Sequence, residues 1–261
     1  MDAETYYLTG CVALAMDSYD EASSNFTEAY GEDATYDRAI QIYEAYLEKD
    51  MEADGTRYLE AALKTEAKNA EDYCNRGKVY YYMEDYSNAQ KELTEAVNQK
   101  STEGMLLLGM VYRAQGDTSN ARSMYQQYVS ADDSDPAKGY NGLALCDMDD
   151  GSYDSALENI SKGLEDASTE EMQDLLFNEI VVYEKKLDFA TALSKIQEYI
   201  KMFPDDENAA KELTFLQSRN GELSNDTASD TTENTDAEAA SDAEDTADTS
   251  DGSDESGEEE Y

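Results

Sequence analysis

The stretch from Asp72 to Ala96 constrains the fold of this chain more than any other. It reads DYCNRGKVYYYMEDYSNAQKELTEA, and its apolar spacing predicts two amphipathic helices joined by a tight turn. Gly77 and Ala89 carry almost no side chain, so we expect the two helices to approach closely where these residues face each other. Asp85 lies in the turn, where a short acidic side chain can cap the second helix.

The second helix of this hairpin recurs along the chain. A small residue followed four positions later by a bulky one appears at intervals of 33, 34, 32, 35 and 36 residues. The small residues are Ala22, Gly55, Ala89, Ala121, Ala156 and Ala192, and the bulky ones are Phe26, Leu59, Leu93, Tyr125, Ile160 and Ile196. One hairpin cannot bury its apolar face alone, so six in register predict a stack of hairpins.

A helix–turn–helix period near 34 residues resembles the tetratricopeptide-repeat (TPR) family over residues 3 to about 219. The family's first-helix pattern is Trp-x2-Leu-Gly-x2-Tyr, and the fourth unit matches its last part with Leu108, Gly109 and Tyr112. The second and sixth units have Tyr43 and Ile180 where the pattern has glycine, so we expect those hairpins to open wider. The resemblance implies an all-α, right-handed solenoid of about six repeats.

The C-terminal region changes composition after Arg219. Residues 206–219 predict one more amphipathic helix, which caps the sixth repeat. Residues 220–261 are acidic and low in complexity, with Leu223 as the one large aliphatic residue, so we predict a disordered tail. The domains are therefore residues 1–219, the TPR array with its capping helix, and residues 220–261, a tail that either solubilises the protein or attracts a basic one.

The net charge of −42 limits the partners that the chain can bind. Residues 220–261 hold 16 of the 61 acidic residues and no Lys or Arg, which leaves a net charge of −26 on residues 1–219. Such a surface repels nucleic acid and anionic lipid, and it attracts basic proteins. No apolar run approaches 18 residues, so we expect no membrane span.

Catalytic chemistry is not expected from this composition. The chain has no histidine, the side chain that most often transfers protons in enzymes near neutral pH. Cys11, Cys74 and Cys146 are spaced by 63 and 72 residues, which fits neither a zinc site nor a disulfide framework. We expect no enzyme activity, no cofactor and no metal.

Positions on the first helices give the candidate binding site. In the TPR family these helices line a concave groove that contacts bound peptide, and here the same positions are largely apolar. The candidate residues are Tyr7, Cys11, Ile40, Lys78, Tyr81, Tyr82, Leu106, Met110, Asn141, Leu145 and Phe177. The family's carboxylate-binding groove uses Lys and Asn, but Lys78 and Asn141 come from different units, so we do not expect that activity. The alternative is that these side chains pack against one another inside a tightly curved array.

The resulting functional hypothesis is a non-enzymatic scaffold or adaptor. It would bind a protein, as a peptide or amphipathic segment with basic flanks, in the groove. One alternative is an acidic chaperone-like protein that holds a basic client, and another is a module of a bacterial envelope or secretion assembly. The absence of a leader sequence predicts a cytoplasmic location, with an exported or lipid-anchored protein as the alternative if the N-terminus is truncated. The sequence does not predict an oligomeric state.

Overall fold

The computed structural model describes residues 1–165 and 167–232, with side chains through residue 221. Within these residues the chain forms 13 α-helices and no strand. The helices are α1 (Ala3–Ala15), α2 (Tyr19–Glu32), α3 (Tyr36–Leu47), α4 (Glu52–Ala62), α5 (Ala70–Tyr82), α6 (Tyr86–Asn98), α7 (Thr102–Ala114), α8 (Thr118–Val129), α9 (Pro136–Asp149), α10 (Tyr153–Gly163), α11 (Thr169–Lys185), α12 (Phe189–Met202) and α13 (Glu207–Thr232). The all-α repeat architecture predicted from the sequence is confirmed.

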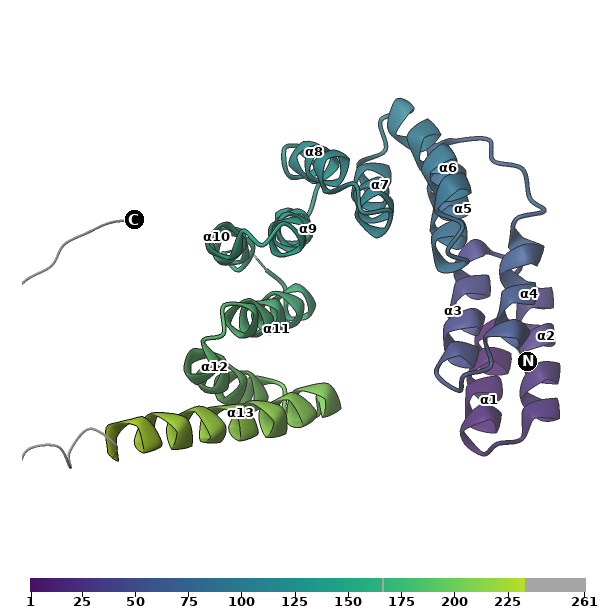
Figure 1. Cartoon of the computed structure of the whole chain (residues 1–261). Helices are drawn as coiled ribbons and strands as arrows, with labels where there is room; N and C mark the ends of the chain where they lie inside the picture. The colour runs from purple at the N-terminus through teal and green to yellow at the C-terminus, as the bar shows by residue number, and fades with distance from the viewer. Residues whose placement is uncertain (166, 233–261) are drawn as a thin grey trace, which may run out of the picture.

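The helices pair into six hairpins that follow one another around an arch (Figure 1). Hairpins α1–α2 to α5–α6 form one arm, α7–α8 lies at the top, and α9–α10 and α11–α12 form the other arm. From α7 to α12, the first helix of each hairpin lies toward the inside of the arch and the second helix toward the outside. Residues on first helices are thereby brought to one concave side.

Glycines on the first helices let the hairpins close. A Cβ atom added to Gly77 would lie 2.4 Å from Cγ of Leu93, and one added to Gly109 would lie 2.6 Å from the ring of Tyr125. The glycine therefore accommodates the bulky residue of the second helix. The prediction that Gly77 faces Ala89 is wrong, because Leu93 fills that space while Ala89 is buried one turn away.

The second hairpin exchanges the positions of the large and the small residue. Tyr43 replaces glycine on α3, and a Cβ atom added to Gly55 on α4 would lie 2.9 Å from the Tyr43 backbone. The hairpin closes as tightly as the others, so the prediction that it opens wider is wrong. The sixth hairpin does open, as predicted, because α11 and α12 make the sparsest backbone contact of the six hairpins. Ile180, which stands where the pattern has glycine, is fully buried.

All six hairpin turns share one backbone conformation. The residue that precedes each second-helix N-cap has a left-handed φ, between +55° and +78°. These residues are Asp17, Asp50, Glu84, Gly116, Gly151 and Leu187. Asp85 accepts a hydrogen bond from the backbone N–H of Asn88, which confirms the predicted cap of α6.

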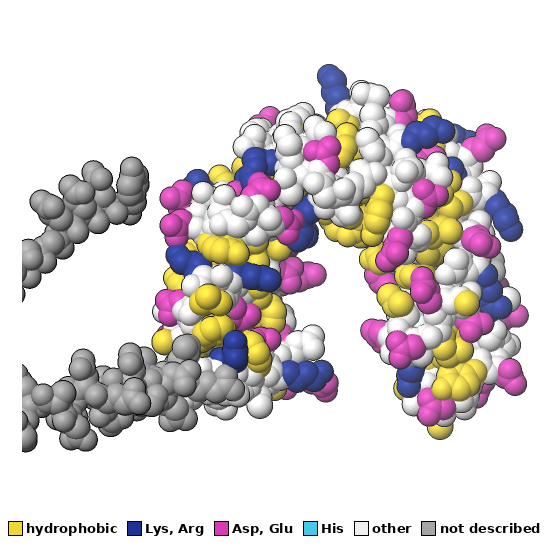
Figure 2. Space-filling view, viewed as in Figure 1, with side chains coloured by type: hydrophobic (Ala, Val, Ile, Leu, Met, Phe, Trp, Pro, Cys, Tyr) yellow, Lys and Arg dark blue, Asp and Glu magenta, His cyan; other side chains and the backbone are white. Residues whose placement is uncertain are grey.

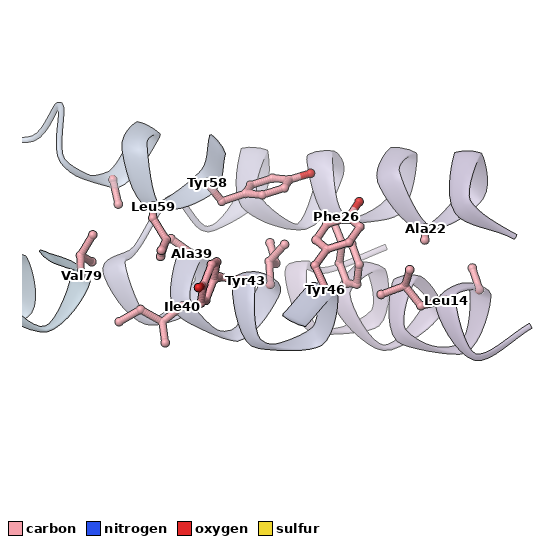
Figure 3. Close-up of a cluster of buried hydrophobic side chains, with 13 residues drawn as sticks. Leu14, Ala22, Phe26, Ala39, Ile40, Tyr43, Tyr46, Tyr58, Leu59 and Val79 are labelled. Atoms are coloured by element: carbon pink, nitrogen blue, oxygen red, sulfur yellow. The ribbon is translucent and has the colours of Figure 1, made fainter. Parts of the chain in front are cut away.

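The joints between hairpins are apolar. Leu59 of α4 and Val79 of α5 lie in one buried cluster with the core of the first two hairpins (Figure 3). The backbones of α4 and α5 nevertheless approach each other little. Arg76 of α5 reinforces this joint by donating hydrogen bonds of 2.8 and 2.6 Å to the carbonyl oxygens of Leu63 and Thr65, at the end of α4. It also pairs with Glu92 of α6 at 3.2 Å.

The helix α13 covers the last hairpin. Ala209 and Leu216 are fully buried against α12, and Leu213 packs beside them, as predicted for a capping helix. The helix continues to Thr232, although it was predicted to end at residue 219. Between Arg219 and Thr232 the sequence contains no proline, and a helix anchored at one end propagates through such residues. The rest of the predicted disordered tail, residues 233–261, lies outside the described residues.

Candidate functional site

A cleft of about 770 Å³ lies on the concave side of the arch, where α5, α7 and α9 meet. Five of the candidate residues line it: Tyr81 from α5, Leu106 and Met110 from α7, and Asn141 and Leu145 from α9. The space-filling view shows the hollow that the arch encloses, with hydrophobic side chains along its inner edge (Figure 2). The repeat register thus brings residues from three successive hairpins to one site.

The rim of the cleft is charged, and most of its charges are paired. Arg113 donates to both carboxylate oxygens of Asp149, at 2.6 and 3.2 Å. Lys138 lies 3.4 Å from Glu171. These pairs hold their side chains at the edge and leave the floor to apolar groups.

Asp174 of α11 is the exception on this rim. It is exposed and lies in no ion pair among the described residues. Partial burial by the cleft, together with the carboxylates of Glu170 and Glu171, raises the pKa of Asp174. A carboxylate in this setting lacks a counter-charge, so the site favours a cationic group.

The cleft continues toward α11 and α13 as a second hollow of about 370 Å³. Phe177, another candidate residue, lines this part together with Asn141, Leu145 and Asp174. Asn178 donates a 2.7 Å hydrogen bond to the side-chain oxygen of Asn141. The combined surface offers apolar contacts beside amide and acidic groups.

The N-terminal candidate residues do not line this cleft, because they pack against their neighbours. The guanidinium of Arg38 lies 4.9 Å from the centre of the Tyr7 ring, and burial raises the pKa of Tyr7 to about 12. Ile40 is only 3% exposed, so its predicted place on an open groove is wrong. Cys11 packs at the edge of the same buried cluster.

Two further candidates lie on α5, outside the cleft. Tyr82 donates a hydrogen bond to Glu44 and packs on the ring of Tyr43. Lys78 is partly exposed but lines neither hollow. The alternative that the groove residues pack against one another therefore describes the first two hairpins, whereas the open cleft begins at Tyr81 of the third hairpin and continues along the hairpins that follow.

Sequence reasoning missed the polar residues of the cleft. Arg113, Lys138, Asp149, Asp174 and Asn178 fall outside the two first-helix positions that the repeat register was used to select. Each lies on a first helix, so counting every position of α7, α9 and α11 that faces inward would have found them.

Other kinds of site receive no support from the described residues. No group of three or more acidic or cysteine side chains among them could hold a metal ion. Burial raises the pKa of the Cys146 thiol to about 11, which makes it a packing residue rather than a nucleophile. No helix among the described residues is long and apolar enough to cross a membrane.

The comparison with protein families agrees with this architecture. The family model for the tetratricopeptide repeat matches residues 74–136 and, in a second overlapping match, residues 106–170. These matches run from within α5 to the end of the α9–α10 hairpin, and these helices build most of the cleft. Over these residues the chain is similar to tetratricopeptide-repeat proteins, whose fold commonly mediates binding between proteins.

Solved structures with the same fold are distant in sequence. A tetratricopeptide repeat protein from Parabacteroides merdae ATCC 43184 is 17% identical, with a TM-score of 0.60 over 82% of this chain and 84% of its own. PilW, a type IV pilus biogenesis factor, is 14% identical, with a TM-score of 0.53 over 81% of this chain and 98% of its own. The Cut9–Hcn1 hetero-tetramer of the APC/C is 17% identical, with a TM-score of 0.50 over 82% of this chain and 42% of the matched chain. No curated protein matches the sequence.

Proposed function

We propose that this protein is a scaffold that binds a peptide segment of another protein in the cleft between α5 and α11. The observation that carries the proposal is the cleft itself, in which five of the candidate residues on first helices line one hollow. Leu106 and Met110 are half-buried, so apolar surface is available to a ligand while the same side chains support the core beneath. Apolar anchors of this kind dominate the energy of peptide binding.

The charge of the site defines the preferred segment. Asp174 has a raised pKa and no ion-pair partner, and a bound cation would relieve the desolvation of its carboxylate. The net charge of −42 adds a long-range attraction for basic segments. The segment therefore carries large apolar residues that fill the floor and a Lys or Arg that reaches Asp174.

A selection from a displayed library of random 15-residue peptides tests the proposal on the full chain. We expect enriched peptides that combine apolar residues with Lys or Arg, and we expect Asp174→Lys to weaken their binding at least tenfold. Asp174 is exposed and unpaired, so this change should leave the thermal unfolding temperature unaltered. Glu158→Lys on the outer helix α10 makes the same charge change away from the cleft and serves as the matched control.

Salt separates this function from the acidic chaperone-like alternative. Binding in an apolar cleft should weaken only a few-fold between 50 and 500 mM salt, because only the contact at the rim is screened. A protein that holds basic clients through its overall charge would instead lose binding steeply with salt and would be indifferent to Asp174→Lys. Peptides that bind with that second pattern, or an absence of enrichment, would contradict the proposal.

A further inference from the structure

One face of α1, which lies at the lower end of one arm in Figure 1, carries exposed apolar side chains. Leu8, Val12 and Met16 are 54%, 59% and 72% exposed. They follow one another at a spacing of four residues, so they form one stripe along the helix. The opposite side of α1 is buried in the first hairpin through Gly10, Ala13 and Leu14.

The repeat register shows what kind of face this stripe is. Val12 occupies the position that Val79, Val111, Cys146 and Val182 occupy in α5, α7, α9 and α11. Each of those four residues is 0% exposed. Each belongs to a buried cluster that contains the bulky residue of the preceding second helix: Leu59, Leu93, Tyr125 and Ile160 respectively. The stripe on α1 thus occupies the position that, on α5, α7, α9 and α11, is buried against the preceding second helix.

We propose that the Leu8–Val12–Met16 face binds an amphipathic helix from a partner protein. The partner helix presents a small residue followed four positions later by a large apolar one, because this is the pattern of the second helices that precede α5, α7, α9 and α11. Its flanks are basic, because the chain has a net charge of −42, α1 contains no Lys or Arg, and Asp2 lies near the start of the stripe without an ion-pair partner among the described residues. The other two carboxylates near the stripe, Glu4 and Asp17, already pair with Arg38 and Lys49 at 2.8 and 3.5 Å. This surface is separate from the concave cleft and does not depend on the function proposed for it.

A second copy of the chain fits this face poorly. Two α1 helices packed face to face would bring together two molecules that each carry a net charge of −42, and these repel each other. The stripe on α1 also cannot stack on α12 of a second array, because α13 already covers α12 with Ala209 and Leu216. Charge and coverage therefore favour a basic partner helix.

The α6 helix of this chain supplies a probe for the face. It covers α7, whose Leu107 and Val111 stand where α1 has Leu8 and Val12. The probe is a fluorescent peptide of residues 86–98 with two lysines added at each end. A lactam joins Lys91 to position 87 after a Ser87→Glu change, since both positions are exposed in α6 and a short peptide needs such a constraint to stay helical.

Fluorescence anisotropy with the full chain reads out binding. We expect saturable binding that Val12→Asp weakens at least tenfold, and the same loss with a probe that carries Leu93→Asp. Two control variants should leave binding intact. Leu187→Asp introduces the same charge at a 72% exposed residue far from α1 in the sequence, and Asp174→Lys alters the cleft. Circular dichroism checks that Val12→Asp is folded, and the double variant Leu8→Ser, Met16→Ser repeats the test without a new charge.

Three results would overturn the inference. The first is no binding of the probe to the wild-type chain, and the second is binding that survives both α1 variants. The third is a dimer of the wild-type chain in sedimentation that Val12→Asp abolishes, because the occupant would then be a second copy.

Discussion

One residue in each hairpin turn adopts a left-handed backbone conformation that the family pattern does not specify. The six hairpin turns need a left-handed residue, and glycine supplies it in only two of them. Leu187 adopts φ +60° in the sixth turn with a side chain that is 72% exposed. A left-handed conformation costs a non-glycine residue about 1–2 kcal/mol, and an exposed side chain regains little of this through packing.

Leu187→Gly should therefore stabilise the protein. We expect the free energy of unfolding to rise by about 1 kcal/mol, because glycine adopts this φ without steric cost. Gly116→Ala in the fourth turn should lower it by a similar amount, since no atom lies near enough to confound the strain there. Urea unfolding measures both changes, and an unaltered midpoint for Leu187→Gly would contradict the account of the turn.

The contact between Gly77 and Leu93 predicts coupled mutations. Gly77→Ala should destabilise the protein by roughly 1–3 kcal/mol, because its new methyl group meets Cγ of Leu93 at 2.4 Å. In a Leu93→Ala background the same change should cost much less, since the space is then vacant. A double-mutant cycle by chemical denaturation measures this coupling, and additive effects would show that the two residues do not share the space.

At the scale of the helices, the sequence predicted which helices form and in what order. It predicted less well where each helix ends and which side chains its residues contact. The period near 34 residues is enough to place six hairpins, because each hairpin must bury the same face. It does not reveal that Gly55 compensates for Tyr43, since two residues from different helices must be compared at once. The period also does not show whether the inward-facing side chains of the first helices line an open cleft or pack against one another. Tyr7 and Ile40 share a register position with Leu106. Tyr7 packs against Arg38 and Phe26, and Ile40 is buried in the cluster that holds Leu59 and Val79, and the repeat period alone does not reveal these neighbours.

The capping helix α13 carries a pH-sensitive contact that no pattern indicated. Glu212 of α13 faces Glu184 of α11, and Oε1 of each is buried without a hydrogen-bond partner among the described residues. Burial and the Glu212 carboxyl group raise the pKa of Glu184 to about 7, while Lys185 opposes the shift. The folded state therefore holds a proton that the unfolded chain releases at lower pH.

The free energy of unfolding should fall as the pH rises from about 4.5 to about 7. Above that range the Glu184–Glu212 pair should cause no further change. A folded-state pKa above the unfolded value means that the native state binds more protons in this range, so its stability decreases with pH. Glu212→Gln should flatten this part of the profile and raise the melting temperature near pH 8. Glu198→Gln, an exposed residue on α12, is the control and should leave the profile unchanged.

For the whole molecule, α4 and α5 make the sparsest backbone contact of any second helix with the first helix that follows it, although α3 also packs against α5 there. Stability in a repeat array is approximately the sum of each hairpin and its contacts with the next. The backbones of α4 and α5 approach each other little, and Arg76 supplies the polar contacts there. The sequence contains Arg76 at a position where the family pattern has leucine, and this substitution could be noticed but not interpreted without the carbonyl groups that it binds.

Arg76→Met should loosen this joint selectively. We expect a loss of about 1.5–3 kcal/mol, because the change removes charge-assisted hydrogen bonds while it keeps the apolar stem. Amide hydrogen exchange should accelerate in α1 to α4 and stay slow in α7 to α12. Glu92→Gln removes only the ion pair and should have a smaller effect, and uniform acceleration along the chain would argue against a local joint.

The position of this joint has a mechanical consequence. Tyr81, near the end of α5, lines the cleft, whereas α1 to α4 lie beyond the joint as an arm of two hairpins (Figure 1). A repeat array bends most readily where successive hairpins make the fewest contacts. The sparse contact between α4 and α5 lies at the edge of the cleft. A rotation of a few degrees between α4 and α5 would move the far end of the arm by several ångströms, while the cleft floor built by α7 and α9 keeps its shape.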